Sequence, residues 1–237
     1  MANEGGLRIG SFVGAAIVID SSLVLLAAYV LGTALLDAGF SGLPGAGAFL
    51  LVLLLAVVVH EFAHAGVAAA LKIPSKRIVL TFFGGYVQFA WTPKARWHEI
   101  AVSAAGPVAN LICWQIASLV AHGVAPNTPA SWVISQFAYV NLLLGAFNLL
   151  PGLPLDGGHV LRAALNYFMP RARAWFGAAL VGLLVAAGIG AYAFTRGAWW
   201  TLMVALLLGL AAWGEAQRSR RAMAGDVQPP PSTTSNA

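Results

Sequence analysis

The sequence predicts an all-α polytopic membrane protein, with about six transmembrane helices and a short membrane-associated β-hairpin or sheet. Of its 237 residues, 59% are hydrophobic and only 9% are charged, whereas a soluble domain carries about 25% charged residues. The apolar residues also fall in long blocks, each close to the roughly 20 residues that cross the hydrocarbon core of a bilayer. These observations exclude an ordinary soluble enzyme and favour one compact helical domain in the membrane.

The predicted elements follow one another over residues 1–217. Residues 7–18 are rich in Ile, Val and Gly and suit one or two short strands. The apolar blocks predict helices over residues 21–36, 46–71, 97–121, 130–150, 172–194 and 198–213. Between the second and third helices, β-branched and aromatic residues at 78–89 are interrupted by Gly84 and Gly85, which predicts a hairpin. Residues 218–237 are expected to form a disordered cytoplasmic tail, because Pro, Ser and Thr replace large apolar side chains toward its end.

The basic residues predict the orientation of the chain. Apart from Arg196, every Lys and Arg lies before the first helix, after the last one, or in the connections that follow the second and fourth helices. These regions share one side of a six-span topology, and the positive-inside rule makes that side, with both termini, cytoplasmic. The net charge of +5 does not indicate a nucleic-acid partner, since the basic residues lie between apolar blocks and not in one patch.

Three ionisable residues interrupt the apolar run of the second predicted helix: His60, Glu61 and His64. An ionisable side chain in mid-membrane costs roughly 3 kcal/mol, so three of them together are difficult to explain by packing. Residues at i and i+4 share a helix face, so both imidazoles can bind one Zn²⁺ ion while Glu61 serves as a general base. The helix therefore predicts an intramembrane zinc site with His60 and His64 as ligands and Glu61 as the catalytic residue.

Catalytic zinc normally keeps three protein ligands, so one further donor is expected. Cys113 is the only cysteine, and a single thiol cannot build a thiolate site. The other donors near the apolar blocks are Asp20, Asp37, Glu99, Asp156, Glu215, His98, His122 and His159.

Asp156 stands out among these donors because two prolines precede it and two glycines follow it, so residues 148–158 are predicted to be non-helical. The segment could bend back into the bundle and bring the carboxylate to the metal. The alternative is an ordinary loop with an Asp-Gly turn. In the predicted topology Asp156 lies on the cytoplasmic side, toward which the histidine pair also lies, whereas Asp37 and His122 fall on the far side. His159 is expected to be a loop residue or a neighbour of the ligands.

These motifs resemble those of the site-2 proteases, a family of intramembrane zinc metalloproteases. The resemblance covers most of the chain and rests on His60-Glu61-Phe62-Ala63-His64, Phe83-Gly84-Gly85, Gly106-Pro107-Val108-Ala109-Asn110, and Asn148 upstream of Pro154-Leu155-Asp156-Gly157-Gly158. It implies that zinc is bound by His60, His64 and Asp156. It also implies that Glu61 is catalytic and that Asn148 positions the substrate.

The family cleaves transmembrane segments of other membrane proteins, commonly after a first cut outside the membrane, and releases a cytosolic regulator. The resemblance therefore implies a single-span substrate, such as an anti-sigma factor or a membrane-tethered regulator. The strand around Gly84 and Gly85 is then the expected edge for pairing with an unwound substrate. Gly106 and Asn110 also fit simple helix packing and an interhelical hydrogen bond. The PDZ and CBS modules of many bacterial relatives are expected to be lacking.

A membrane metal-ion transporter or channel is the alternative function, because a His/Glu/Asp site along a wet path would look similar. Transit across the membrane needs polar groups through its full thickness, and the outer halves of the predicted helices hold few of them. The sequence therefore favours the protease.

Overall fold

The computed structural model describes residues 6–82, 84–91 and 95–225. Its contacts group the chain into two compact units. The N-terminal unit comprises Met1–Ala90 and Ala105–Ala146, and the C-terminal unit comprises Trp91–Ala104 and Phe147–Ala237. The long helix α3 (Arg96–His122) contributes its first residues to the C-terminal unit and the rest to the N-terminal unit.

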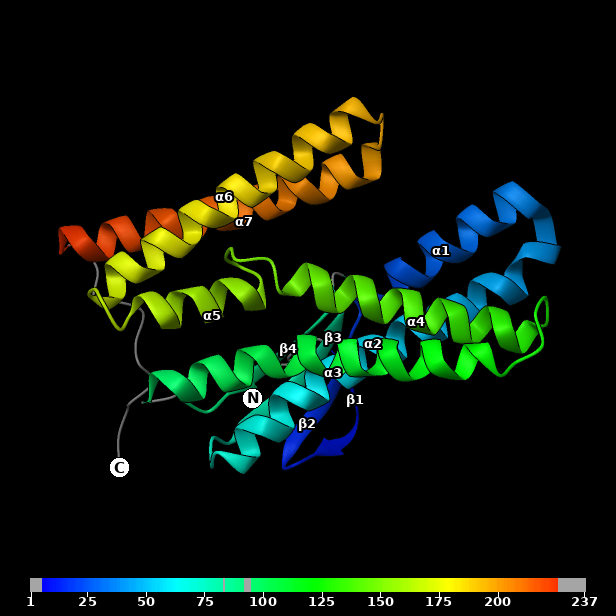
Figure 1. The fold of residues 1–237 in the computed structure, drawn as a ribbon, viewed down its shortest axis with the longest axis horizontal. Coiled ribbons are helices and arrows are strands. Elements are labelled where there is room, and N and C mark those ends of the chain that lie inside the picture. Colours follow the sequence, from blue (N-terminus) through cyan, green and yellow to red (C-terminus); the bar gives the residue numbers. More distant parts are fainter. Residues whose placement is uncertain (1–5, 83, 92–94, 226–237) are drawn as a thin grey trace. The chain divides into compact units, whose positions relative to one another are not determined.

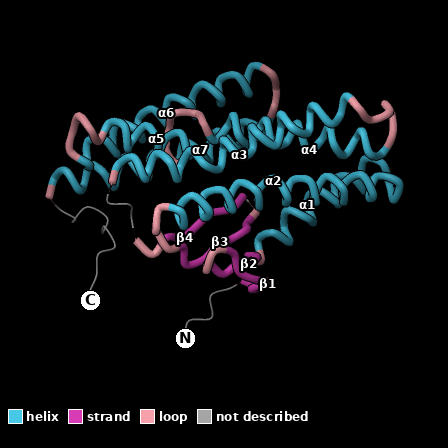
Figure 2. The backbone as a smooth tube through the Cα atoms, turned by 60° about the horizontal axis from the view of Figure 1, so that its bottom comes forward, coloured by secondary structure: helices cyan, strands magenta, loops and turns pink. Residues whose placement is uncertain are grey.

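A four-stranded sheet with the order β1-β2-β3-β4 belongs to the N-terminal unit (Figure 2). Strands β1 (Gly6–Phe12) and β2 (Ala15–Asp20) form one antiparallel hairpin, and β3 (Ser75–Thr81) and β4 (Gly84–Phe89) form another. The two hairpins join through parallel pairing of β2 with β3, in which Ile17 is the partner of Ile78. Ile78 is fully buried together with Ala15 of β2 and Ala65 of the helix that covers the sheet. The predicted hairpin is thus confirmed, and it is one half of a larger sheet.

Helices α1 (Ser22–Ala38) and α2 (Leu43–Ala70) follow β2 and are joined by the short 3₁₀ turn Gly39–Gly42. The remaining long helix of the unit, α4 (Pro129–Asn148), packs on α2. Val52 and Ala56 of α2 form a buried cluster with Val140 of α4. The first four predicted helices are confirmed, with shifts of a few residues at their ends.

The C-terminal unit contains α5 (Asp156–Leu165), α6 (Arg171–Thr195) and α7 (Trp199–Ala224). Helices α6 and α7 run side by side as a hairpin (Figure 1). Small side chains allow this close packing: Ala178 and Ala179 of α6 share a buried cluster with Ala216 of α7. The fifth and sixth predicted helices correspond to α6 and α7.

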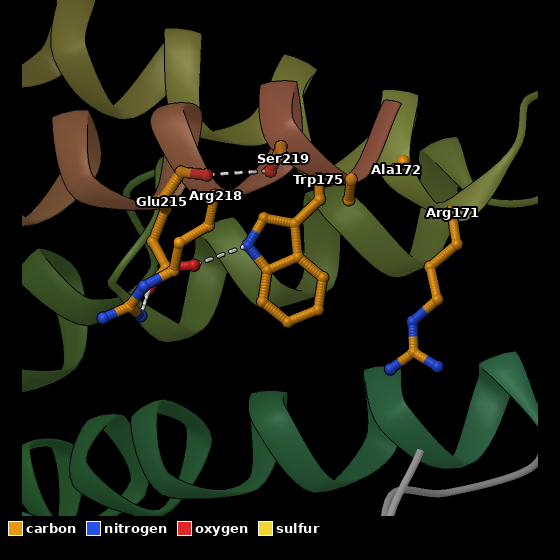
Figure 3. A pocket seen from close by; sticks show the side chains of 7 residues that line it. Arg171, Ala172, Trp175, Glu215, Arg218 and Ser219 are labelled. Atoms are coloured by element: carbon orange, nitrogen blue, oxygen red, sulfur yellow. Dashed lines mark hydrogen bonds and ion pairs between the residues drawn. The ribbon is translucent and has the colours of Figure 1, made fainter. Parts of the chain in front are cut away.

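Helix α7 corrects the predicted tail, which was expected to begin at residue 218. The helix continues to Ala224 because its last turns are tied together and to α6 (Figure 3). Glu215 accepts hydrogen bonds from the indole Nε1 of Trp175 at 2.8 Å and from Arg218 Nη1 at 2.7 Å. Ser219 Oγ donates to the Glu215 carbonyl oxygen at 2.8 Å. The rest of the predicted tail, residues 226–237, lies outside the described residues, as does Phe83.

Five segments of the described chain are long and apolar enough to cross a membrane: Ser22–Ala70, Arg96–His122, Pro129–Asn148, Arg171–Thr195 and Trp199–Ala224. The first segment contains both α1 and α2, so each of the six predicted helices corresponds to one of these spans or to a part of one. The chain is an integral membrane protein, mostly helical and with one small sheet.

Candidate active site

His60, Glu61 and His64 lie on one buried stretch of α2. Their relative exposures are only 5%, 4% and 7%, and ionisable groups buried this deeply are usually paired or bound to a metal. The two imidazole rings lie edge to face, with centroids 4.7 Å apart. One ring nitrogen of each lies within 4.8 Å of the other. The helix therefore presents two metal-binding nitrogens at the spacing that one ion needs.

Gly106 of α3 closes this site from the neighbouring helix. A Cβ atom added at this glycine would stand 2.7 Å from His60 Nε2, and it would also collide with His64 Nε2. Both Nε2 atoms thus face the same small space beside the α3 backbone, a space that any larger residue would fill. A cradle lined by two imidazole nitrogens and kept open by a glycine fits a metal ion such as zinc.

Asn110, one turn further along α3, holds the opposite side of the His60 ring. Its Oδ1 atom lies 2.5 Å from His60 Nδ1. An amide oxygen can only accept a hydrogen bond, so the Nδ1 atom of His60 is the donor. A metal-binding histidine commonly donates its second ring N–H to such an acceptor, which fixes the ring orientation and the tautomer. The Gly106–Asn110 motif therefore does more than pack two helices together.

Gly85 at the beginning of β4 faces Glu61. A Cβ atom at this position would stand 2.5 Å from Glu61 Cγ and 2.7 Å from Glu61 Oε1. The preceding Gly84 adopts φ = +123°, a conformation that residues with a side chain rarely adopt. The two glycines are therefore required for different reasons. Gly84 makes the turn between β3 and β4, and Gly85 lets the strand approach the Glu61 carboxylate.

Asp156, Asn148 and His159 belong to the C-terminal unit. Asn148 is the last residue of α4, and Asp156 is the first residue of α5; both are partly buried. This corrects the prediction that residues up to 158 are non-helical. Asp156 occupies the first turn of a helix, where the helix dipole favours a carboxylate.

The glycines after Asp156 explain how this helix begins in a crowded place. A Cβ atom at Gly157 would collide with the Leu149 carbonyl group, and one at Gly158 would collide with the backbone of Gly152. The Pro-rich segment and the start of α5 therefore pack backbone against backbone. Such packing holds Asp156 in a fixed position within its unit.

Several other predicted ligand candidates are engaged elsewhere or exposed. Glu99 forms an ion pair with the buried Arg162, and Glu215 is bound by Trp175 and Arg218. Hydrogen bonds from the side chain of Ser22 and from its backbone N–H lower the pKa of the Asp20 carboxyl group. Asp37 and His122 are exposed.

A family model described as Peptidase family M50 matches residues 48–128 and 115–187, which together make up more than half of the chain. The chain belongs to Peptidase family M50. The matched residues include the His60–His64 motif, the Gly106–Asn110 motif and Asp156. The predicted resemblance to the site-2 proteases is confirmed.

Two relatives of this M50 chain carry names that mark them as candidate zinc metalloproteases. One, from Synechocystis, is 33% identical over 171 residues, which cover 68% of this chain and 44% of the relative. The other, Rip3 of Mycobacterium tuberculosis, is 40% identical over 151 residues, which cover 61% of this chain and 37% of the relative. The chain thus matches less than half the length of these relatives. Their names agree with the predicted zinc cofactor.

A solved site-2 protease from Methanocaldococcus jannaschii has the same fold. The structures match with a TM-score of 0.69 over 89% of this chain and 95% of the other, at 24% sequence identity. This likeness confirms the predicted fold class of this M50 member, a helical membrane protein with a small sheet.

One polar residue near the site was not singled out from the sequence. Asn141 of α4 is fully buried, and its Oδ1 atom accepts a hydrogen bond from Asn110 Nδ2 at 2.7 Å. The signal that could have identified it is an amide in the middle of an otherwise apolar predicted span.

Proposed function

We propose that this M50 member is a zinc endopeptidase that cleaves transmembrane segments of other membrane proteins. The buried His60–Glu61–His64 face inside a candidate membrane span carries the proposal. Two metal-binding nitrogens and one carboxylate on a single helix supply two of the three expected zinc ligands and the general base for metal-assisted amide hydrolysis. Their position in an apolar helix suits a substrate that reaches the enzyme through the lipid bilayer.

The zinc ligands in this proposal are the Nε2 atoms of His60 and His64 and a carboxylate oxygen of Asp156. The position of Asp156 in the first turn of α5, where the helix dipole favours a carboxylate, supports this choice. Bound zinc would supply Lewis-acid activation of a water molecule and of the scissile carbonyl group.

Glu61 acts as the general acid–base catalyst. Its carboxylate takes a proton from the attacking water and then passes that proton to the amine that leaves when the C–N bond breaks. The burial of Glu61 in α2 keeps its side chain away from bulk water, and Gly85 leaves room for its carboxylate beside β4.

Substrate positioning is assigned to Gly84, Gly85 and Asn148. Strand β4 is an edge of the sheet in the order β1-β2-β3-β4, and an edge strand can pair with an extended peptide. Proteolysis requires such an extended backbone, because a helix hides its amide bonds in internal hydrogen bonds. Gly85 lies both on this edge strand and beside Glu61. A peptide paired with β4 would therefore hold its scissile amide bond close to the general base.

The substrate in this proposal is a single-span membrane protein, such as an anti-sigma factor or a membrane-tethered regulator. Cleavage would release a cytosolic fragment, and both termini are proposed to be cytoplasmic, with the active site within the bilayer toward the same side. The α6–α7 hairpin supports this orientation: Arg196 lies at its turn, while Arg171, Arg218, Arg220 and Arg221 lie at its open end. By the positive-inside rule, this distribution of Arg residues favours a cytoplasmic position for the open end.

The proposal is tested by placing the full chain in proteoliposomes with tagged single-span reporters that differ in the Gly and Pro content of their spanning segments. We expect cleavage within the spanning segment, identified by mass spectrometry of the new ends. Cleavage should stop when zinc is chelated and return when zinc is added. Zinc flux into vesicles, with all reporters intact, would instead favour the alternative of a metal-ion transporter.

A further inference from the structure

A chain of buried amides connects α4 to the imidazole of His60. Asn110 and Asn141 are both 0% exposed. Asn110 Nδ2 donates to Asn141 Oδ1 at 2.7 Å and to the Ala56 carbonyl oxygen at 3.1 Å. Asn141 Nδ2 donates to the Phe137 carbonyl oxygen at 2.8 Å. Buried amides without partners are costly in a membrane span, so this chain must be closed at both ends.

The two backbone carbonyl groups that accept from the amide chain, those of Phe137 and Ala56, determine the direction of every hydrogen bond in it. A carbonyl oxygen can only accept, so Asn141 must turn its NH₂ group toward Phe137 and its oxygen toward Asn110. Asn110 must then present its NH₂ group to Asn141, and the Ala56 carbonyl demands the same orientation. Its remaining oxygen therefore faces His60. Neither amide can flip without placing two oxygens or two NH₂ groups against each other.

This fixed direction decides which nitrogen of His60 carries the proton. The Asn110 oxygen accepts at 2.5 Å from Nδ1, so Nδ1 is protonated and the lone pair is on Nε2. Nε2 is the atom that faces the Gly106 cradle together with Nε2 of His64. The other tautomer would point an N–H bond into the cradle and would exclude a cation.

We infer that Asn141 is a positioning residue of the metal centre, which acts through Asn110 to hold His60 in its metal-binding tautomer and orientation. The inference rests on the zinc site of the proposed function, but it does not require proteolysis. It assigns α4 a role in metal binding although α4 supplies no ligand. Loss of a partner that orients a ligand typically weakens metal affinity about 10- to 100-fold.

The experiment measures the zinc dissociation constant of the full chain in lipid nanodiscs by competition with a chromophoric chelator. The variants are Asn110→Leu, Asn141→Leu, the double variant, and Asn141→Asp. Cys113→Ala is the matched control, because Cys113 lies on α3 close to Asn110 and lines an apolar groove of the N-terminal unit, but takes part in none of the hydrogen bonds of the amide chain. Circular dichroism and the thermal midpoint establish that each variant is folded.

We expect Asn110→Leu to weaken zinc binding about 30-fold and Asn141→Leu about 10-fold. The double variant should be no weaker than Asn110→Leu alone, because Asn141 acts only through Asn110. Asn141→Asp should retain most of the affinity, since a buried, protonated carboxyl group can donate to the Phe137 carbonyl oxygen and still accept from Asn110 Nδ2. The ¹⁵N shifts of His60 in the metal-free chain should show a protonated Nδ1 in the wild type and a mixture of tautomers in Asn141→Leu.

Three results would overturn the inference. The first is wild-type affinity in Asn141→Leu. The second is a loss of zinc affinity in the double variant that equals the product of the fold-losses in the two single variants. The third is an unchanged His60 tautomer in a folded Asn141→Leu chain. If the wild type binds no zinc, the proposed function fails together with the inference. If the wild type binds zinc and substitution of Asn141 does not change the dissociation constant, only the inference fails.

Discussion

Gly85 of β4 approaches Glu61 of α2 so closely that an added Cβ atom would stand 2.7 Å from Glu61 Oε1. The sheet and the helix that carries the metal motif therefore meet at a glycine and a carboxylate. Gly85 was predicted as part of a substrate-binding strand, and the structure adds a second reason for its lack of a side chain.

Gly85→Ala is expected to reduce cleavage of the reporter roughly 100-fold, because the methyl group must displace the general base from its position. Bound zinc should not change, since Glu61 is not a ligand in this account. The matched control is Gly10→Ala on β1, where an added Cβ makes only an ordinary contact at 3.9 Å. Wild-type cleavage in Gly85→Ala would show that the position of Glu61 is not limited by this strand.

Gly106→Ala is expected to act on the metal and not on the base. The new methyl group would occupy the space that both Nε2 atoms face, so zinc affinity should fall by at least about 10-fold. Gly66→Ala on α2 is the control, because an added Cβ there meets nothing within 4 Å. Equal zinc affinity in both variants, measured by chelator competition, would contradict the proposed cradle.

Asp156 is predicted to complete the zinc site. Asp156→Ala should lower the zinc content of the purified chain, whereas His159→Ala should leave it near the wild-type value. Elemental analysis of the two variants, purified without added metal, measures the difference. A full zinc content in Asp156→Ala, with loss in His159→Ala, would transfer the ligand role to His159.

The ion pair of Arg162 and Glu99 is expected to stabilise the C-terminal unit. Arg162 is buried, which lowers its pKa to about 10, and it lies 3.9 Å from the centre of the Trp175 ring. It is therefore charged at neutral pH, and Glu99→Gln would leave this buried charge without its carboxylate. The free energy of unfolding should fall by about 3 kcal/mol.

The control for this prediction is the exposed pair of Arg218 and Glu215, since Arg218 has a side-chain exposure of 74%. Arg218→Gln should change the free energy of unfolding by less than about 1 kcal/mol. The denaturation midpoints in detergent compare the two variants. Similar small losses in both would contradict the buried role of Arg162.

The sequence predicted the elements that depend on local pattern. Apolar blocks located the six long helices, and spacing on one helix identified His60, Glu61 and His64. Parallel pairing of β2 with β3 was not predictable in this way, because the two strands are separated by α1 and α2 and their pairing leaves no local signal. The start of α5 at Asp156 was missed because its prolines and glycines suggested a loop, whereas the glycines serve close backbone packing.

The partners of His60 depend on tertiary structure. In the sequence, Asn110 belongs to a family motif that helix packing alone could explain. The only signal at Asn141 is that an amide is costly in an apolar span. Their connection requires α2, α3 and α4 to pack with these residues facing one another. Periodicity along a single helix cannot supply that information.

The most direct test of the central claim compares the wild type with Glu61→Gln, with zinc content and reporter cleavage measured on the same preparations. The account predicts that the variant keeps its zinc, because His60 and His64 are unchanged, and that cleavage falls by roughly 1000-fold because the general base is lost. Cleavage by the zinc-loaded Glu61→Gln chain at the wild-type rate would contradict the account.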